Sequence, residues 1–219
     1  MEYNNYSDIL EYVPIFTDKA INNINLFKNL VKFIEEKNIK KILVSLSGGV
    51  DSMVLLEILK NIKSDIICCH INYNNRDESK KEKDFLIEYC NYKNIKLEYI
   101  DMEITRDLIK RDVYENLSKK TRYDFYKKLC DDNEIEGVFL GHHEDDLSEN
   151  IFNNIMRGGR EITDLSVFKE ENIILGVKVF RPLLKNRKEE IYKIAHEYQI
   201  PYFKDTTPDW SCRGKMRRK

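Results

Sequence analysis

The sequence predicts an α/β fold, a Rossmann-like, doubly wound, mostly parallel sheet with helices on both faces. Short apolar runs, typical of buried strands, alternate with longer segments in which apolar residues recur every three or four positions, as in helices. The chain has 219 residues, of which 42% are hydrophobic, with only 8 Gly and 4 Pro. This length and composition suit one domain with a sizeable core and no flexible linker.

The two patterns assign the elements in chain order. In the first helix, Ile21, Ile24 and Phe27 recur at helical spacing, whereas the first strand is apolar almost throughout. The expected elements are a helix over 19–37, a strand over 42–46, a helix from about 53, a strand over 65–71, a helix over 79–93, a strand over 96–100, a helix over 116–133, a short strand over 138–140, a helix over 145–156, an extended segment over 173–180 and a helix over 187–199.

The beginning of the chain looks different from the rest. Residues 1–18 are polar and mixed, and we expect an irregular or loosely docked segment there. We therefore divide the chain into an N-terminal extension and helix, residues 1–39, and one α/β domain, residues 40–219.

Composition excludes several classes of protein. Lys and Arg number 37 against 38 Asp and Glu, a formal net charge of −1 that neither indicates nor excludes a nucleic-acid partner. The five cysteines are scattered without a C-x-x-C pair, so no disulfide framework and no zinc or iron–sulfur site is expected. No apolar run could span a membrane. We expect a cytoplasmic protein with reduced thiols and no membrane partner.

The segment S-G-G-V-D-S at 47–52 lies between the first strand and its helix. Glycines there let the backbone turn and approach an anion closely, and the exposed N–H groups at a helix start attract phosphates. Asp51 is an acid at a position where phosphates would bind, which makes sense if Mg²⁺ bridges the two. The spacing is not that of a Walker loop. We interpret the segment as a phosphate-binding loop, not as an ordinary strand–helix turn.

A second polar cluster, G-H-H-E-D-D-L-S-E-N at 141–150, follows the strand over 138–140. If a helix begins at its start, His142, Asp146 and Glu149 lie on one face, at i, i+4 and i+7. They could then hold Mg²⁺, bind a substrate ammonium or move protons. The alternative is an acidic first turn with a capping Asp.

These motifs resemble a known family. S-G-G-x-D-S is the PP-loop of the ATP pyrophosphatases, and the run at 141–150 is similar to that of the tRNA(Ile)-lysidine synthetases. Segments at 69–79, 120–125 and 180–191 are similar to further motifs of that family, as are Asp205, Arg213 and Arg217 of its late motif. The resemblance runs from about residue 40 to 217 and corresponds to the family's catalytic N-terminal domain, a PP-loop ATPase domain.

The resemblance implies an activity and its partners. Such enzymes use ATP to adenylate the wobble cytidine of a CAU-anticodon tRNA(Ile), and the ε-amine of L-lysine then displaces AMP to form lysidine. ATP with Mg²⁺, tRNA and L-lysine are the expected ligands. Without the domains that help recognise tRNA in bacterial relatives, we expect a homodimer or a separate C-terminal tRNA-recognition partner.

The resemblance also implies roles for individual residues. The catalytic set is Asp51, His142, Asp146 and Glu149, with Asp51 also binding Mg²⁺. The ATP-binding set is Ser47, Gly48, Gly49, Val50, Asp51, Ser52, His70, Asn72, Arg122 and Gly141. The RNA- or substrate-binding set is Arg122, Arg157, Arg181, Arg213 and Arg217.

Three alternatives stay open. A different PP-loop enzyme, such as a 2-thiocytidine synthetase, would need an iron–sulfur cluster that the cysteine spacing does not favour. A binding module without ligation activity would not need intact Asp51, Asp146 and Glu149. A ligase acting on a small molecule is the third. The basic residues at 213–219 are a solvated tail or an arm that contacts phosphates.

Overall fold

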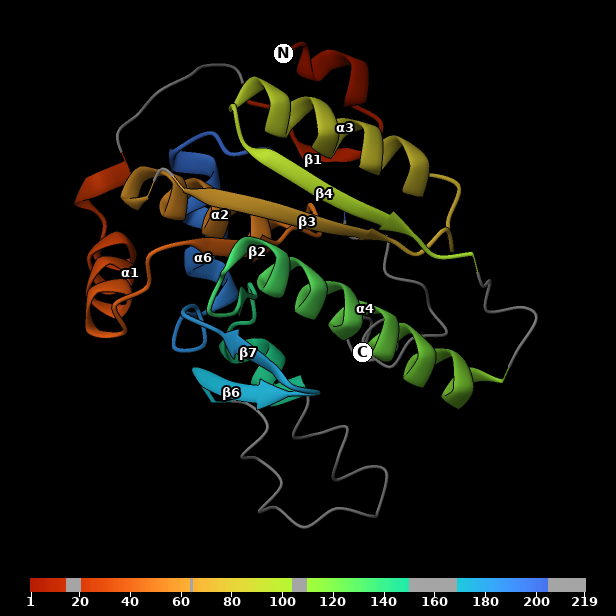
Figure 1. The fold of residues 1–219 in the computed structure, drawn as a ribbon. Helices are drawn as coiled ribbons and strands as arrows, with labels where there is room; N and C mark the ends of the chain where they lie inside the picture. The colour runs from red at the N-terminus through yellow and green to blue at the C-terminus, as the bar shows by residue number, and fades with distance from the viewer. Residues whose placement is uncertain (15–20, 64, 104–109, 150–168, 205–219) are drawn as a thin grey trace.

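The computed structural model describes residues 1–14, 21–63, 65–103, 110–149 and 169–204. Its centre is a six-stranded sheet in the order β4-β3-β2-β5-β7-β6, in which only the β6–β7 pair is antiparallel (Figure 1). The strands are β2 (Ile42–Ser45), β3 (Ile66–Asn72), β4 (Lys96–Asp101), β5 (Val138–Phe139), β6 (Glu171–Ile174) and β7 (Val177–Phe180). The predicted mostly parallel sheet is confirmed.

Helices cover both faces of this sheet, as predicted. One face carries α1 (Asn25–Glu36), α2 (Val50–Ile62), α3 (Ser79–Tyr92) and α6 (Lys188–Glu197), and the other carries α4 (Arg111–Asn133). Alternation along β2 explains the two layers, because Ile42 and Val44 belong to one core cluster and Leu43 to the other. All three side chains are fully buried, as in a strand of a parallel sheet covered on both sides.

The strand order places the functional region. From β2 the chain moves outward to β3 and β4 on one side, and β5 and β7 lie on the other. The order therefore reverses beside β2, and ligands of open α/β sheets bind at the carboxyl ends of the strands at such a point.

Residues 1–14, the described part of the N-terminal segment, are not loosely docked, which corrects our expectation for them. Residues 3–6 form a 3-10 helix, η1 (Tyr3–Tyr6), and β1 (Leu10–Tyr12) pairs with a strand absent from our assignment, β8 (Tyr202–Phe203). Tyr6, Ile9 and Leu10 are buried in the main core. Because only a few apolar side chains attach this segment and polar residues separate them, the sequence shows no apolar pattern that would predict its packing.

Several further boundaries differ from the sequence assignment, and the first helix, expected over 19–37, spans Asn25–Glu36. The segment expected to be extended over 173–180 is a hairpin, because Leu175 and Gly176 both adopt positive φ (48° and 78°) and form its turn. The helix α4 begins at Arg111, earlier than predicted. The helix expected from 145 begins at residue 144 and is helical to 149, and its continuation to 156 lies outside the described residues.

The two helices that follow the N-terminal segment pack into the main core. The 3-10 helix η2 (Ile21–Asn23) precedes α1, and both contribute to the cluster that also contains α2. The division into residues 1–39 and 40–219 stays a prediction about sequence organisation.

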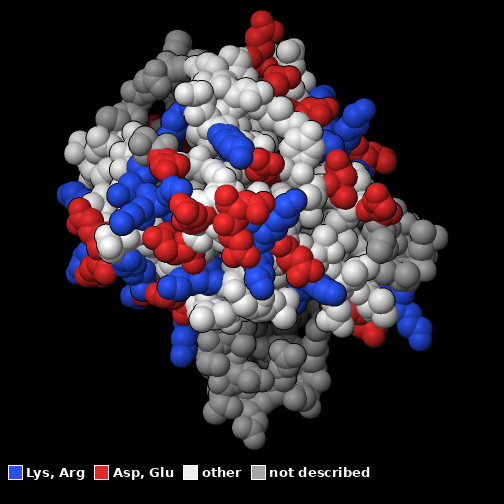
Figure 2. All heavy atoms as spheres, viewed as in Figure 1, with Lys and Arg blue, Asp and Glu red and all other residues white. Residues whose placement is uncertain are grey.

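The surface is mixed in charge. On the face shown in Figure 2, Lys and Arg alternate with Asp and Glu, and the described residues there form no continuous basic area. Within the described part of the chain, no helix is both long and apolar enough to cross a membrane.

Candidate functional site

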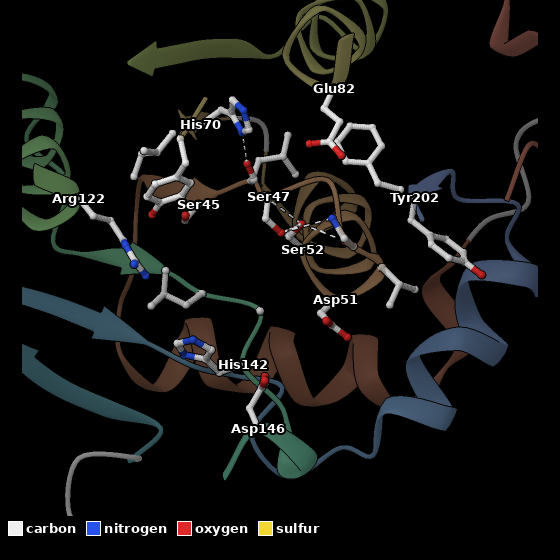
Figure 3. A pocket seen from close by; sticks show the side chains of 18 of the residues that line it. Ser45, Ser47, Asp51, Ser52, His70, Glu82, Arg122, His142, Asp146 and Tyr202 are labelled. Carbon is white, nitrogen blue, oxygen red and sulfur yellow. Dashed lines mark hydrogen bonds between the residues drawn. The ribbon is translucent and has the colours of Figure 1, made fainter. Parts of the chain in front are cut away.

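A cavity of about 440 Å³ lies at the carboxyl ends of β2, β3 and β5, where the strand order reverses. Figure 3 shows it from close by, with Arg122 and Tyr202 on opposite sides of the Ser47–Ser52 loop. Its walls come from segments far apart in sequence: Ser45, Leu46, Ser47, Gly49, Val50, Asp51, Ser52, His70, Ile71, Tyr73, Arg76, Glu82, Arg122, Tyr126, Leu140, Gly141, His142, Asp146, Lys188, Tyr192, Tyr202, Phe203 and Lys204.

The Ser52 hydroxyl organises the loop from inside. It donates to the Gly49 carbonyl oxygen (3.0 Å) and accepts the Ser47 amide (3.2 Å), and the Ser47 and Ser52 hydroxyls are 3.1 Å apart. Ser52 is buried, with 4% of its surface exposed. Ser47 and Ser52 were both assigned to the ATP-binding set; in the structure their hydroxyls also bond to each other and fix the loop.

Two positions require glycine because neighbouring atoms occupy the space that a side chain would need. Gly48 has φ +82°, and a Cβ atom there would lie 1.9 Å from the Phe203 ring. A Cβ at Gly141 would lie 3.0 Å from the backbone of Asp51 and Ser52 at the start of α2. Gly48 is not among the cavity-lining residues, so it shapes the loop from behind, whereas Gly49 and Gly141 line the cavity.

The start of α2 faces the cavity. Val50, Asp51 and Ser52 are its first three residues, and the amide groups of a first turn have no acceptor within their own helix. Together with the positive end of the helix dipole, these amides form a site suited to an anion. The loop therefore has the geometry that its sequence predicted.

His143 lies among three carboxylates, and sequence analysis did not single it out. Its Nε2 lies 3.5 Å from Asp51 Oδ1 and 3.4 Å from Asp146 Oδ2, and its Nδ1 lies 3.5 Å from Asp145 Oδ2. The ring is 1% exposed. Burial alone would lower the pKa of His143, but contact with Asp51 and the charges of Asp51 and Asp146 raise it overall.

The helix begins two residues later than the i, i+4, i+7 spacing assumed. This later start explains why the sequence analysis did not single out His143. His142 lies before the helix, and the amide of His143 donates to Asp146 Oδ2 (3.2 Å), as in a capping box. Asp146 thus caps the helix and also lines the cavity, so the capping interpretation holds and its expected functional role stays a prediction. Glu149 is not among the lining residues, so the structure joins His142 and Asp146 but not Glu149.

His142 is held by a buried arginine. Arg181 Nε donates to His142 Nδ1 (3.0 Å), and Arg181 Nη1 donates to the Lys169 carbonyl oxygen (3.0 Å). Because Arg181 is 2% exposed and absent from the cavity wall, it supports His142 and offers little surface to RNA in this structure.

The end of β3 brings to the cavity one of its two residues that were assigned to the ATP-binding set. His70 lines the cavity, and its Nδ1 lies 2.9 Å from the Leu46 carbonyl oxygen, which can only accept, so Nδ1 carries the proton. Burial lowers the pKa of His70 and favours the neutral ring. Asn72 is elsewhere: its amide donates to Asn74 and Asp101, and it is not in the cavity wall.

The basic residues expected to bind phosphates divide into two groups. Arg122 lines the cavity from α4, with its guanidinium 5.9 Å from the Tyr73 ring centroid. Arg157, Arg213 and Arg217 lie outside the described residues.

Further charged residues in the wall were not predicted. Arg76 pairs with Glu82 at 2.8 Å, and Lys188 and Lys204 come from α6 and from the residue after β8. Arg76 and Lys188 lie within the segments at 69–79 and 180–191 that resemble family motifs, but neither was assigned a role. No motif marks Glu82 or Lys204, which the fold alone brings to the cavity.

The carboxylates beside His143 fit a magnesium ion that also binds phosphate. Asp51 Oδ1 is buried and accepts no hydrogen bond, and Asp146 contacts the same imidazole. Among the described residues, no group of three or more His, Cys, Asp or Glu side chains could hold a metal alone. Mg²⁺ typically uses one or two carboxylates and completes its shell with water and substrate phosphates.

Comparison with known proteins decides the family. The model of the PP-loop domain matches residues 22–216, which include the Ser47–Ser52 loop and the whole cavity wall. The chain belongs to the PP-loop family. The Ser47–Ser52 loop carries the S-G-G-x-D-S motif, for which it is called the PP-loop. The fold class predicted from the sequence is confirmed.

Curated relatives of this PP-loop domain are named tRNA(Ile)-lysidine synthases. The protein from Ureaplasma parvum is 31% identical over 203 residues, covering 89% of this chain and 58% of its own length. Those from Chlamydia muridarum and Mycoplasmopsis pulmonis are 31% and 32% identical, covering 81% and 75% of this chain and 56% of their own lengths. The chain therefore spans a little over half the length of these relatives.

Two solved structures share the fold. The U34-tRNA thiolase NcsA from Methanococcus maripaludis, solved with its [4Fe-4S] cluster, has a TM-score of 0.66 at 17% identity, covering 88% of this chain and 70% of that one. An NH3-dependent NAD synthetase from Campylobacter jejuni has a TM-score of 0.56 at 14% identity, covering 80% and 72%.

Proposed function

We propose that this chain is the ATP-using part of a tRNA(Ile)-lysidine synthase. It would adenylate the wobble cytidine of a CAU-anticodon tRNA(Ile), release pyrophosphate, and join L-lysine to the base with release of AMP. The observation that supports this most is the PP-loop cavity in a chain about 31% identical to lysidine synthases over most of its length. Such an enzyme would act in the cytoplasm.

In this proposal ATP lies along the PP-loop with its phosphates at the start of α2. The amides of Val50, Asp51 and Ser52 would bind phosphate oxygens, supported by Ser47, Gly49 and Gly141 in the same wall. Gly48 would contribute through loop shape. The adenosine would lie beside His70, and Arg122 would contact a phosphate of the nucleotide or of RNA. Asn72 contributes by fixing the end of β3.

Asp51 is the residue proposed to hold Mg²⁺, with Asp146 nearby. When bound, Mg²⁺ would neutralise charge on the phosphates. The first step is attack of the cytidine O2 on the α-phosphorus, which breaks the bond to the pyrophosphate leaving group. The start of α2 stabilises the negative charge on the transferring phosphate, because its dipole is fixed before the reaction.

Lysine transfer needs a group that accepts a proton. The ε-amine must be neutral to attack C2 of the cytidine, and the bond to AMP then breaks while the nitrogen loses a further proton. Asp146 and His142 line the cavity and are proposed to bind the ammonium and accept its protons, with Glu149 as a more distant member of the set. Arg181 positions His142 by donating to its Nδ1.

Recognition of tRNA extends beyond the described site. Arg157, Arg213 and Arg217 remain proposed RNA contacts, together with Arg122. A homodimer or a separate C-terminal partner remains the proposed source of tRNA selection. Arg181 would reach RNA only if its hydrogen bonds to His142 and Lys169 opened.

The experiment is AMP release by the purified chain with ATP, Mg²⁺, lysine and an unmodified CAU-anticodon tRNA. We expect AMP only when the tRNA is present, and we expect Asp51→Asn to lower the rate by at least about 100-fold, a range typical for loss of a group that stabilises charge at a reacting centre. Asp145→Asn is the matched control, because Asp145 contacts His143 but does not line the cavity. Equal rates for Asp51→Asn and the wild type would exclude the proposed metal role.

A further inference from the structure

We propose that the N-terminal segment, residues 1–14, positions the PP-loop for ATP by holding β8 against Gly48. The inference rests on the proposed ATP-binding function. Neither the segment nor β8 carries a recognisable motif, and residues 1–14 precede the region matched by the family model, residues 22–216.

The strand β8 makes the contact with the PP-loop. The Phe203 amide donates to the Gly48 carbonyl oxygen (2.9 Å), and the Phe203 ring occupies the place where a Gly48 side chain would be. Phe203 also lines the cavity. This short strand therefore sets the position of the glycine whose positive φ turns the loop.

The N-terminal segment supplies the strand partner of β8. In the two-stranded sheet, Leu10 pairs with Phe203 and Tyr12 with Tyr202, and the Lys204 amide donates to the Ile9 carbonyl oxygen (2.9 Å). A two-residue strand without its partner would be poorly ordered, because isolated strand pairs are already marginal in water. The position of Phe203 thus depends on β1.

Side chains attach the segment to α3 as well. Tyr6 packs edge-on against Phe85 at 5.2 Å, and Phe85 packs against Phe203 at 5.3 Å, measured between ring centroids. The Tyr6 hydroxyl donates to Glu88. Figure 1 shows η1 and β1 beside α3. The ring contacts connect the segment to the PP-loop through Phe203.

The N-terminal segment also holds the side chain of Lys204, a positively charged residue in the cavity wall. Lys204 Nζ donates to the carbonyl oxygens of Asp8 (2.8 Å) and Ser7 (3.4 Å), and Lys204 lines the cavity. Removing the segment would release both the loop contact and this lysine. The expected consequence is a PP-loop that spends less time in the shape that binds phosphate.

The test is the dissociation constant for ATP with Mg²⁺, measured by equilibrium dialysis on the full chain and on Phe203→Ala, with deletion of residues 1–12 as a second variant. If the binding-competent loop becomes one-tenth as populated, the dissociation constant rises about tenfold. We expect this rise in both variants, with partial recovery in Phe203→Leu, which keeps an apolar side chain against Gly48. Hydrogen exchange should also become faster in peptides covering residues 46–53.

The control is Leu30→Ala on α1. Leu30 is 1% exposed in the same core cluster, and no α1 residue lines the cavity. It should lower thermal stability while leaving the dissociation constant within about twofold of the wild type, since the loop keeps its contact with β8. The inference is overturned if Phe203→Ala binds ATP as tightly as Leu30→Ala. If the wild type binds no ATP, the proposed function itself is wrong, which is a distinguishable result.

Discussion

At the scale of single residues, the site depends on one position with no space for a side chain and on polar side chains held by specific contacts. Gly48 cannot carry a side chain because of Phe203, and the Ser52 hydroxyl bonds to the Ser47 amide and to the Gly49 carbonyl oxygen. His143 is held among three carboxylates. Sequence patterns identified the loop and the carboxylates, but they could not rank His143 above His142, because that ranking depends on where the helix begins.

Gly48 and Gly49 should differ sharply in their tolerance of alanine. Gly48→Ala should lower the free energy of unfolding by about 2 kcal/mol or more, because it places an L side chain at positive φ and against Phe203. At Gly49 a Cβ would meet only the Ser47 hydroxyl at 3.5 Å. Urea unfolding of the two variants without ATP checks this, and equal losses would contradict the described loop.

His70 should make stability depend on pH. Because burial lowers its folded pKa below the unfolded value of about 6.5, the neutral ring favours folding above that pH. This contribution should be lost as pH falls from about 6.5 through the folded pKa. Urea unfolding of wild type and His70→Gln at several pH values measures it. The difference in unfolding free energy between them should shrink as the pH falls, and a difference independent of pH would show that His70 does not titrate this way.

At the scale of elements, long periodic segments were predictable and short contacts were not. Sequence patterns identified the strands β2, β3 and β4 as short, largely apolar runs. They identified the helices α2 and α3 as the longer segments between these runs. The strands β1 and β8 were missed, since two or three residues carry too little pattern and their pairing joins the two ends of the described chain. The hairpin turn was missed because Leu175, not Asn or Asp, precedes Gly176.

That turn provides a test of the β6–β7 hairpin. Leu175 is 59% exposed and has φ 48°, a conformation that Asn adopts more readily than Leu. Leu175→Asn should therefore raise the free energy of unfolding by up to about 1 kcal/mol and create an Asn-Gly turn. Chemical denaturation checks the change, with Ile173→Asn as a control on the adjacent strand. A destabilised Leu175→Asn protein would contradict the turn geometry.

At the scale of the whole molecule, topology assembles a site that no single segment contains. The PP-loop follows β2, His70 comes from β3, Asp146 follows β5, Arg122 comes from α4, and Phe203 and Lys204 come from the end of the described chain. The order of strands explains why these segments meet. The family motifs covered the first four, while the wall formed by β8 emerged only from the fold.

RNA binding should depend on local basic residues and not on total charge, because the net charge is only −1. Replacing Arg217, Arg218 and Lys219 with alanine should weaken tRNA binding and reduce its salt dependence. With fewer phosphate contacts, fewer counterions are released when the RNA binds. Binding titrations at several salt concentrations measure the slope. An unchanged slope would identify residues 217–219 as a solvated tail.

The most direct test of the account is the transfer of labelled lysine to an unmodified CAU-anticodon tRNA by the purified chain with ATP and Mg²⁺. We predict label in the RNA at the wobble cytidine, in amounts that match the AMP released, and none with a tRNA whose anticodon lacks that cytidine. AMP release in the presence of tRNA without label in the RNA would contradict lysidine synthesis, while leaving the PP-loop chemistry in place for another nucleophile.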